Sequence, residues 1–340
     1  NNLKPYIMKK LIYLFLTVLI VGCSGEDSNN QDNNDGDNNQ SSCNGDNSVY
    51  LGLNGVTIKA CDFALVGDTG VVNGVTYTVV DRDMLANMIV NGEDVTKVAT
   101  TLVTDMSNFF NTNTNFNQQI GNWDVTRVVD FTSMFRNATS FNQPLENWQI
   151  TQGEKFNGMF SGATSFNQPL PGGWISSGDY YNSNIVLDYM FSDATSFNQD
   201  ISSWNVFNVY SMTGMFRNAT SFNQDISSWE LKTITNDGVK LMSSMFSGAT
   251  SFNQDLSSWE VGGVVNMGSM FFEATSFNQD ISSWDTANVQ IMSSMFNGAS
   301  SYNQDLSSWN VDNVNSCDSF SYRADSWTLP KPNLPSSCLN

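Results

Sequence analysis

The sequence contains no histidine among its 340 residues. Histidine is the side chain most often used as a general base and as a metal ligand. Its absence excludes Ser-His and Cys-His catalytic pairs and histidine metal centres. No Gly-x-Ser-x-Gly motif and no glycine-rich phosphate loop takes their place. We therefore predict that the protein is not an enzyme and carries no cofactor.

Basic residues are also scarce. Fourteen Lys and Arg stand against 33 Asp and Glu, which gives a net charge of −19. Nucleic-acid binding depends on basic side chains that neutralise phosphates, so the charge argues against a nucleic-acid partner and against an anionic membrane surface. Charged residues are only 14% of the chain. Its polarity comes mainly from Asn, Ser, Thr and Gln.

Most of the chain consists of one short sequence unit that is repeated many times. The unit begins with Phe-Asn-Gln, a Trp follows seven or eight residues later, and a Met-Phe pair closes it. Such a fixed period indicates a stacked repeat architecture. The opening aromatics are Phe116, Phe141, Phe166, Phe197, Phe222, Phe252, Phe277 and Tyr302, at steps of 25, 25, 31, 25, 30, 25 and 25 residues.

One full turn, residues 276–300, contains eight apolar positions separated by Asn, Ser, Thr and Asp. Stacking the turns would bury these positions in one continuous core. We predict a leucine-rich-repeat-like solenoid of eight to nine turns over residues 95–327. Each coil would have a short strand in the Phe-Asn-Gln-Asp-Ile-Ser-Ser-Trp stretch and a helical or 3₁₀ turn at Met-Ser-Ser-Met-Phe.

The segments on either side of the repeats are predicted to be caps, because a solenoid needs terminal units that cover its apolar ends. Residues 43–94 contain β-rich stretches with turns at Asn54-Gly55 and Asn73-Gly74. A helix follows over Asp83–Val90, capped by Asp81 or Asp83 and ended by Asn91-Gly92. Residues 328–340 form the C-terminal cap or tail.

The N-terminal residues predict export and a tether. Lys9 and Lys10 precede an apolar run, Leu11–Val21, which is typical of a signal peptide. Ile20-Val21-Gly22-Cys23 resembles a bacterial lipobox, which implies a signal peptide at 1–22 and lipid on Cys23; the alternative is an ordinary secretory signal. Residues 23–42 are almost all Ser, Gly, Asn, Asp and Gln after Cys23, so we expect a disordered tether.

Four cysteines remain besides Cys23. They are Cys43, Cys61, Cys317 and Cys338, two before the repeats and two at their end. An even number of cysteines in an exported protein indicates disulfides rather than a cysteine metal site. Three pairings are open. We expect Cys43–Cys61 and Cys317–Cys338, because the ends of a long array would lie far apart.

Two rows of repeated side chains are candidate binding sites. The tryptophans either form core or stack on sugar rings. Stacked Asn-Gln pairs are expected to hydrogen-bond from turn to turn. An Asp follows that pair in five turns, where a row of carboxylates either binds calcium or caps turns. These candidate ligand residues are Asp200, Asp225, Asp255, Asp280 and Asp305.

Two units are longer than the rest. Their insertions, Ile175–Leu187 and Leu231–Leu241, occupy the same arc of the coil. They are expected to bulge from one face of the array. Insertions confined to one face either mark a binding face or are tolerated surface loops.

The phrases Met-Ser-Ser-Met-Phe-x-Gly-Ala-Thr-Ser-Phe-Asn-Gln-Asp-Ile-Ser-Ser-Trp and Val-Thr-Asp-Met-Ser-Asn resemble BspA-like leucine-rich-repeat bacterial surface proteins, over about residues 75–320. The resemblance implies a cell-surface or secreted solenoid involved in adhesion and protein contact, without catalytic residues. This chain has Phe, Ile, Trp, Val and Met where that family has Leu, so a standard horseshoe curvature does not follow.

Together these observations predict a non-enzymatic lipoprotein of the bacterial cell envelope, anchored on the outer surface. It would act as an adhesin or protein-binding scaffold for a protein or glycan of a host or neighbouring cell. The alternative is a polysaccharide-binding surface component that uses exposed Trp or Asp rows. Exposure of the tryptophans distinguishes the two.

Overall fold

The computed structural model describes residues 43, 47–175, 185–207, 209–231 and 240–338. The chain divides into two compact units, Asn1–Asn39 and Gln40–Asn340, and the described residues all belong to the second. The predicted signal peptide (1–22), Cys23 and the tether (23–42) therefore lie outside the described residues. No helix in the described part of the chain is long and apolar enough to cross a membrane.

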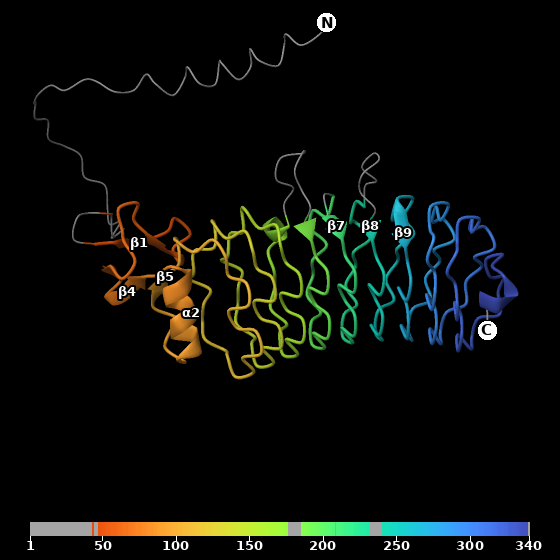
Figure 1. Ribbon diagram of the computed structural model, residues 1–340, viewed down its shortest axis with the longest axis horizontal. Helices are drawn as coiled ribbons and strands as arrows, with labels where there is room; N and C mark the ends of the chain where they lie inside the picture. Colours follow the sequence, from red (N-terminus) through yellow and green to blue (C-terminus); the bar gives the residue numbers. More distant parts are fainter. Residues whose placement is uncertain (1–42, 44–46, 176–184, 208, 232–239, 339–340) are drawn as a thin grey trace, which may run out of the picture. The chain divides into compact units, whose positions relative to one another are not determined.

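The segment before the repeats is rich in β-structure (Figure 1). One sheet pairs two antiparallel strands, and a second pairs two antiparallel strands with a third that runs parallel to its neighbour. Their apolar residues form a core cluster separate from that of the repeats. The strands are β1 (Val49–Leu51) and β2 (Ile58–Ala60) in the first sheet, and β3 (Thr69–Val72) and β4 (Val75–Val79) in the second, whose third strand, β5 (Val98–Ala99), comes from the start of the repeats.

The turn and the helix ends of this segment lie where the sequence predicts them. Asn73 and Gly74 have φ angles of 50° and 79° and form the turn between β3 and β4, as predicted. Helix α2 (Arg82–Val90) begins after Asp81, whose Oδ1 accepts the Met84 N–H at 2.8 Å. It ends at Asn91, as expected.

Residues 95–327, here called the repeat stack, form successive turns that lie side by side (Figure 1). One residue from each turn pairs in parallel with its equivalent in the next turn, from Asp105 to Ser316. In four successive turns the pairing segments are strands of two or three residues, which form the four-stranded parallel sheet β6-β7-β8-β9 with register shifts within β6 and β8. The strands are β6 (Ile185–Val186), β7 (Val209–Ser211), β8 (Lys240–Leu241) and β9 (Val264–Asn266).

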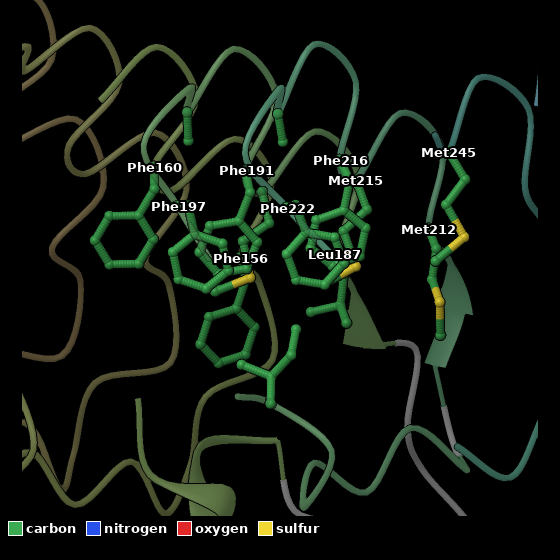
Figure 2. Packing of buried hydrophobic residues seen from close by; sticks show 14 of the residues in the cluster. Phe156, Phe160, Leu187, Phe191, Phe197, Met212, Met215, Phe216, Phe222 and Met245 are labelled. Atoms are coloured by element: carbon green, nitrogen blue, oxygen red, sulfur yellow. The ribbon is translucent and has the colours of Figure 1, made fainter. Parts of the chain in front are cut away.

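The interior of the repeat stack is made of rows of identical side chains. Figure 2 shows Phe160, Phe191 and Phe216 from successive turns in one row. Centroids of neighbouring rings in this row lie 5.7–5.8 Å apart with nearly parallel planes. A second row of rings, which includes Phe222, packs against the first. The ring centroids of Phe216 and Phe222, which belong to one turn, are 3.9 Å apart. Offset-stacked aromatic pairs add about 0.5–1.5 kcal/mol to the burial of their surfaces.

The strand of each coil lies elsewhere than predicted. The described residues of the Phe-Asn-Gln segment contain no strand; the pairing residues come just before Met-x-x-Met-Phe. In the Phe-Asn-Gln segment the Asn side chain replaces backbone pairing. The Asn223 N–H donates to Asn198 Oδ1 at 2.9 Å, and Gln224 Nε2 donates to the same oxygen at 3.0 Å. Expected side-chain bonding between stacked Asn-Gln pairs is thus confirmed.

The Met-Ser-Ser-Met-Phe segment is a run of tight turns rather than the helical turn that was predicted. In each turn, two residues four apart have positive φ, such as Ser294 at 56° and Gly298 at 73°. Their N–H groups donate to the following turn, to the carbonyls of Asp318 and Tyr322. A helix would direct these donors along its own axis, so contact between turns determines the local conformation.

The structure contains two disulfides, Cys43–Cys61 and Cys317–Cys338, the pairing that was expected. The second lies at the C-terminal end of the repeat stack, where short 3₁₀ helix η2 (Ser336–Cys338) follows the last turn. The Phe320 N–H donates to the Cys338 carbonyl at 2.8 Å. This end of the stack is therefore covered by chain rather than left as an open edge.

Candidate functional site

The tryptophans of the repeat motif are core residues. Eight of them have exposed fractions between 0 and 4%. Their rings stack from turn to turn, with centroids 6.2–6.4 Å apart for Trp229–Trp259 and Trp284–Trp309 among others. The buried set is Trp123, Trp148, Trp174, Trp204, Trp229, Trp259, Trp284 and Trp309.

The indole N–H groups are also used inside the stack. Trp229 Nε1 donates to the Ile201 carbonyl at 3.0 Å, and Trp284 Nε1 donates to the Leu256 carbonyl at 2.9 Å. A sugar ring cannot reach a row whose faces and polar atoms are both occupied. The alternative of an exposed Trp row is therefore wrong.

The five aspartates predicted as ligands are exposed and lie along one edge of the stack. Each accepts the backbone N–H two residues further on, as in Ser202 N to Asp200 Oδ1 at 2.9 Å. Bonds from Ser202, first from its hydroxyl and then from its N–H, hold the pKa of Asp200 below its ordinary value. The same donors lower the pKa of Asp225 and Asp305 through Ser227 and Ser307.

This geometry is that of aspartates that cap turns. All five use Oδ1 in the same way, and the other bonds are those of Asp225, Asp255, Asp280 and Asp305 to Ser227, Ser257, Ser282 and Ser307. Across the described ranges, no group of three or more Asp, Glu or Cys residues is placed to hold a metal ion. Calcium binding by this row remains a prediction without a coordination site.

The two long insertions enter the stack at equivalent places. Their C-terminal ends contribute β6 and β8, two strands of the same parallel sheet with β7 between them. The middle of each insertion, 176–184 and 232–239, lies outside the described residues. Whether they form a binding face stays a prediction.

A hollow lies where the N-terminal cap meets the first turns, and no sequence motif indicates it. This hollow, here called the cap cleft, has a volume of about 830 Å³. One wall has Val56, Val75 and Tyr77 from the cap. The first full turn contributes Gln118, Gln119, Gly121 and Asn122, and the next turn contributes Pro144 and Asn147. A pocket of this size lies within the range of ligand sites.

The floor of the cap cleft is fixed by amide side chains. Gln118 accepts the Val95 N–H and donates to the Glu93 carbonyl, both at 2.9 Å. Asn122 Nδ2 donates to the Thr96 carbonyl at 3.0 Å. Asn122 Oδ1 is buried and has no hydrogen-bond partner in the described part of the chain. A buried acceptor without a partner is costly.

The rim of the cap cleft carries a charge pair. Lys97 Nζ lies 3.1 Å from Asp94 Oδ2. The Thr96 hydroxyl and then its N–H donate to Asp94, and these bonds lower the pKa of its carboxyl. Both charged groups are more than half exposed, so the pair contributes little to stability and stays accessible to a ligand.

The chain matches one known protein family. The family described as "Mycoplasma protein of unknown function, DUF285" matches residues 82–185, 177–238 and 235–330. These segments together span well over half of the chain. The chain belongs to the DUF285 family. It is therefore a member of a family of repeat-containing surface proteins. The finer resemblance to BspA-like proteins stays a prediction.

No curated protein and no solved structure matches the chain. The DUF285 match begins with α2 and ends after Trp327, so it covers the repeat stack. Strands β1 to β4 lie before it. The cap cleft thus combines a wall from outside the DUF285 match, with Val56 and Tyr77, and a floor from inside it, with Gln118 and Asn122.

Proposed function

We propose that this DUF285 protein is a non-enzymatic lipoprotein of the bacterial cell envelope, held on the outer surface by lipid on Cys23. Its repeat stack is a solenoid of the leucine-rich-repeat kind, and it acts as an adhesin or protein-binding scaffold. The signal-peptide pattern before Cys23, the polar stretch 24–42 and the absence of histidine support this proposal. The high content of acidic residues argues against a nucleic-acid partner.

The observation that carries the binding function is the chemistry of the cap cleft. The cap lines the cleft with Val56, Val75 and Tyr77, while the first turns line it with amide side chains. An extended peptide has the same two kinds of group, since side chains alternate with backbone N–H and C=O. We assign the cleft to an extended segment of a partner protein, whose backbone N–H and C=O groups would bond to the amide side chains of the lining, such as Gln119 and Asn147.

Selection from a random peptide library against the full chain in mild detergent tests this assignment. Selected peptides should bind the unmodified chain, and Tyr77→Ala should weaken their binding by about tenfold, as expected for an aromatic anchor worth about 1.4 kcal/mol. Tyr210→Ala is the matched control, because Tyr210 is exposed on β7, away from the cleft. Equal binding by both variants, or no selected peptide, would refute the assignment.

The anchor is tested separately by metabolic labelling with a fatty-acid analogue in bacteria. The unmodified chain should take up the label and sediment with membranes. Cys23→Ala should lose both properties, because the thiol that accepts the lipid is gone. Labelling that survives this substitution would contradict the proposed anchor. A screen for hydrolysis of peptides, esters and glycans tests the prediction that the protein is not an enzyme. We expect no hydrolysis.

A further inference from the structure

A second hollow lies on the face of the repeat stack that carries the tight turns. It has a volume of about 430 Å³ and spans four successive turns, from Ser133 to Arg217. None of its lining residues lines the cap cleft. We call it the arginine hollow, after the two arginines that it contains, Arg136 and Arg217.

The shape of the arginine hollow follows from one column of the repeat. The residue after the Met-Phe pair is Arg136, Ser161, Ser192 and Arg217 in the four turns concerned. Two small residues therefore lie between two long ones. Turns stack at about 4.8 Å, so the two arginine positions are about 14 Å apart. The hollow has the length of a short chain of rings rather than of a single ring.

Tyr189 lines this hollow and is unusual for its place in the repeat. Its φ angle is +56°, in the left-handed region that bulky residues rarely adopt. Its side chain is 42% exposed. The equivalent residue is Ser in five turns (Ser133, Ser244, Ser269, Ser294 and Ser319), Gly in two (Gly158 and Gly214) and Asn in one (Asn108).

The neighbouring turn is adapted to the tyrosine ring. A Cβ on Gly214 would lie only 2.5 Å from an edge carbon of the Tyr189 ring. Any other residue at this position would displace the ring. An exposed aromatic in a conformation that costs about 1–3 kcal/mol indicates a role other than stability.

The charged groups of the arginine hollow are arranged as separate donors and acceptors. Asp193 accepts from Ser192 Oγ and from Asn218 Nδ2, each at 2.8 Å. Asp188 accepts from the Thr213 N–H at 2.8 Å and from the Ser211 hydroxyl. Both carboxylates thus bond to neutral partners. Within the described ranges, neither arginine of the hollow forms an ion pair.

These features select a class of ligand. Two guanidinium groups and two carboxylates leave the hollow without net charge, so it does not favour an anionic ligand. None of its described lining residues is aliphatic, and a peptide segment needs an apolar pocket for its anchoring side chain. Sugar hydroxyls both donate and accept hydrogen bonds, and the apolar face of a sugar ring stacks on an aromatic side chain.

We propose that the arginine hollow is a binding site for a neutral oligosaccharide. One sugar ring stacks on Tyr189, and its neighbours bond to Arg136 and Arg217 and to free lone pairs of Asp188 and Asp193. This site is independent of the peptide assignment of the cap cleft. It also replaces the buried tryptophans as the place where this surface protein would contact glycans.

Calorimetric titration of the full chain in mild detergent with neutral linear trisaccharides tests the proposal. The probes are cellotriose, maltotriose and the trimer of N-acetylglucosamine, with the trimer of galacturonic acid as an acidic comparison. At least one neutral probe should bind. Tyr189→Ser should weaken that binding by tenfold or more, and Arg217→Ser should weaken it by about tenfold, as for a hydrogen bond to a charged group.

Tyr189→Ser introduces the residue that five equivalent positions carry, so the variant should fold with an unchanged or higher Tm. Tyr322→Ser is the matched control, because Tyr322 is 52% exposed on the same face but lies outside the hollow. It should bind as the unmodified chain does. Failure of all neutral probes, tighter binding of the acidic trimer, or equal losses in the two tyrosine variants would overturn the proposal. Loss of peptide binding by Tyr77→Ala would leave this test unaffected.

Discussion

Tyr302 occupies the position at which the seven preceding repeats have Phe, and it brings a hydroxyl into the core. Its side chain is fully buried, and the hydroxyl has no hydrogen-bond partner among the described residues. The ring itself packs as the phenylalanines do, 5.7 Å from Phe277. We predict that Tyr302→Phe raises the free energy of unfolding by about 1 kcal/mol, because it removes an unsatisfied polar atom. Urea unfolding at pH 7 measures this change.

The same residue predicts a loss of stability at alkaline pH. Burial, and then the charge on Asp280, raise the pKa of Tyr302 in the folded chain. A tyrosine in the unfolded chain ionises at about pH 10. Ionisation therefore favours the unfolded state, so stability is unaffected below about pH 10 and falls above it. The Tyr302→Phe variant should lose less stability between pH 9 and 11. The exposed Tyr322→Phe serves as the control and should behave as the unmodified chain does.

Trp204 differs from the other buried tryptophans in its indole N–H, which lacks a partner in the described part of the chain. The preceding unit has an extra residue before Trp174, where 3₁₀ helix η1 (Gly172–Trp174) forms. We attribute the missing bond to this extra residue, because the indole of a regular turn donates to a carbonyl of the unit before it, as Trp229 does to Ile201. Trp229→Phe removes a hydrogen bond and Trp204→Phe does not, while both leave a similar cavity. We expect Trp229→Phe to cost about 1 kcal/mol more in urea unfolding; equal costs would contradict this account.

The row of asparagines acts as one structural element, since each side chain completes the backbone of the next turn. Asn223 Oδ1 accepts both the Asn253 N–H and Gln254 Nε2 at 2.9 Å. Asn223→Ala leaves the Asn253 N–H unpaired, while Gln254 Nε2 keeps its bond to the Asn223 carbonyl at 3.0 Å. We predict a loss of about 1–3 kcal/mol in urea unfolding. Ser221→Ala, at an exposed position two residues earlier, should change stability by less than about 0.5 kcal/mol. Similar effects of the two substitutions would show that the row is dispensable.

How far the sequence predicts these elements depends on the range of the contacts that form them. The ends of α2 at Asp81 and Asn91 follow from local capping, and the two disulfides follow from the separation of the stack ends. The period of the aromatics also indicates which side chains are buried. The strand and the helical turn of each coil were misplaced, because bonds between turns, such as those of Asn198 and Ser294, override local preference.

The candidate sites were harder to predict than the fold. The five aspartates were visible as a row, but their use in capping turns depends on backbone geometry. The cap cleft brings together Tyr77 and Pro144, which no motif connects. Tyr189 is visible in the sequence as an aromatic residue at a position where the repeat otherwise has Ser, Gly or Asn. Only the structure shows its positive φ angle and its exposure, which indicate a binding role.

At the scale of the whole described unit, the stack is built from contacts between neighbouring turns. Its stability is therefore close to a sum of turn and interface contributions, and a binding site can be altered at one place without changing the rest. The N-terminal cap does not have the repeat sequence, but it also contacts the stack through its nearest turn. The Ile58 N–H donates to the Asn122 carbonyl at 2.9 Å and continues the pairing of the first turn.

Asp124 is the charged group that joins the cap to the first turns. Its side chain is 1% exposed and lies 3.6 Å from Lys59 of β2. Its Oδ2 accepts from the Thr101 hydroxyl at 2.8 Å. Asp124→Ala leaves Lys59 and Thr101 without this partner, and we predict a loss of about 1.5–3 kcal/mol at the interface of cap and stack. Hydrogen exchange should become faster in residues 49–79 and stay unchanged in residues 240–327, because distant turns share no contacts with the cap.

Thr126→Ala is the matched control, since its hydroxyl contacts Asp124 from within the same turn and its loss leaves the Lys59 pair intact. Uniformly faster exchange in the Asp124 variant would show that cap and stack unfold as one cooperative unit.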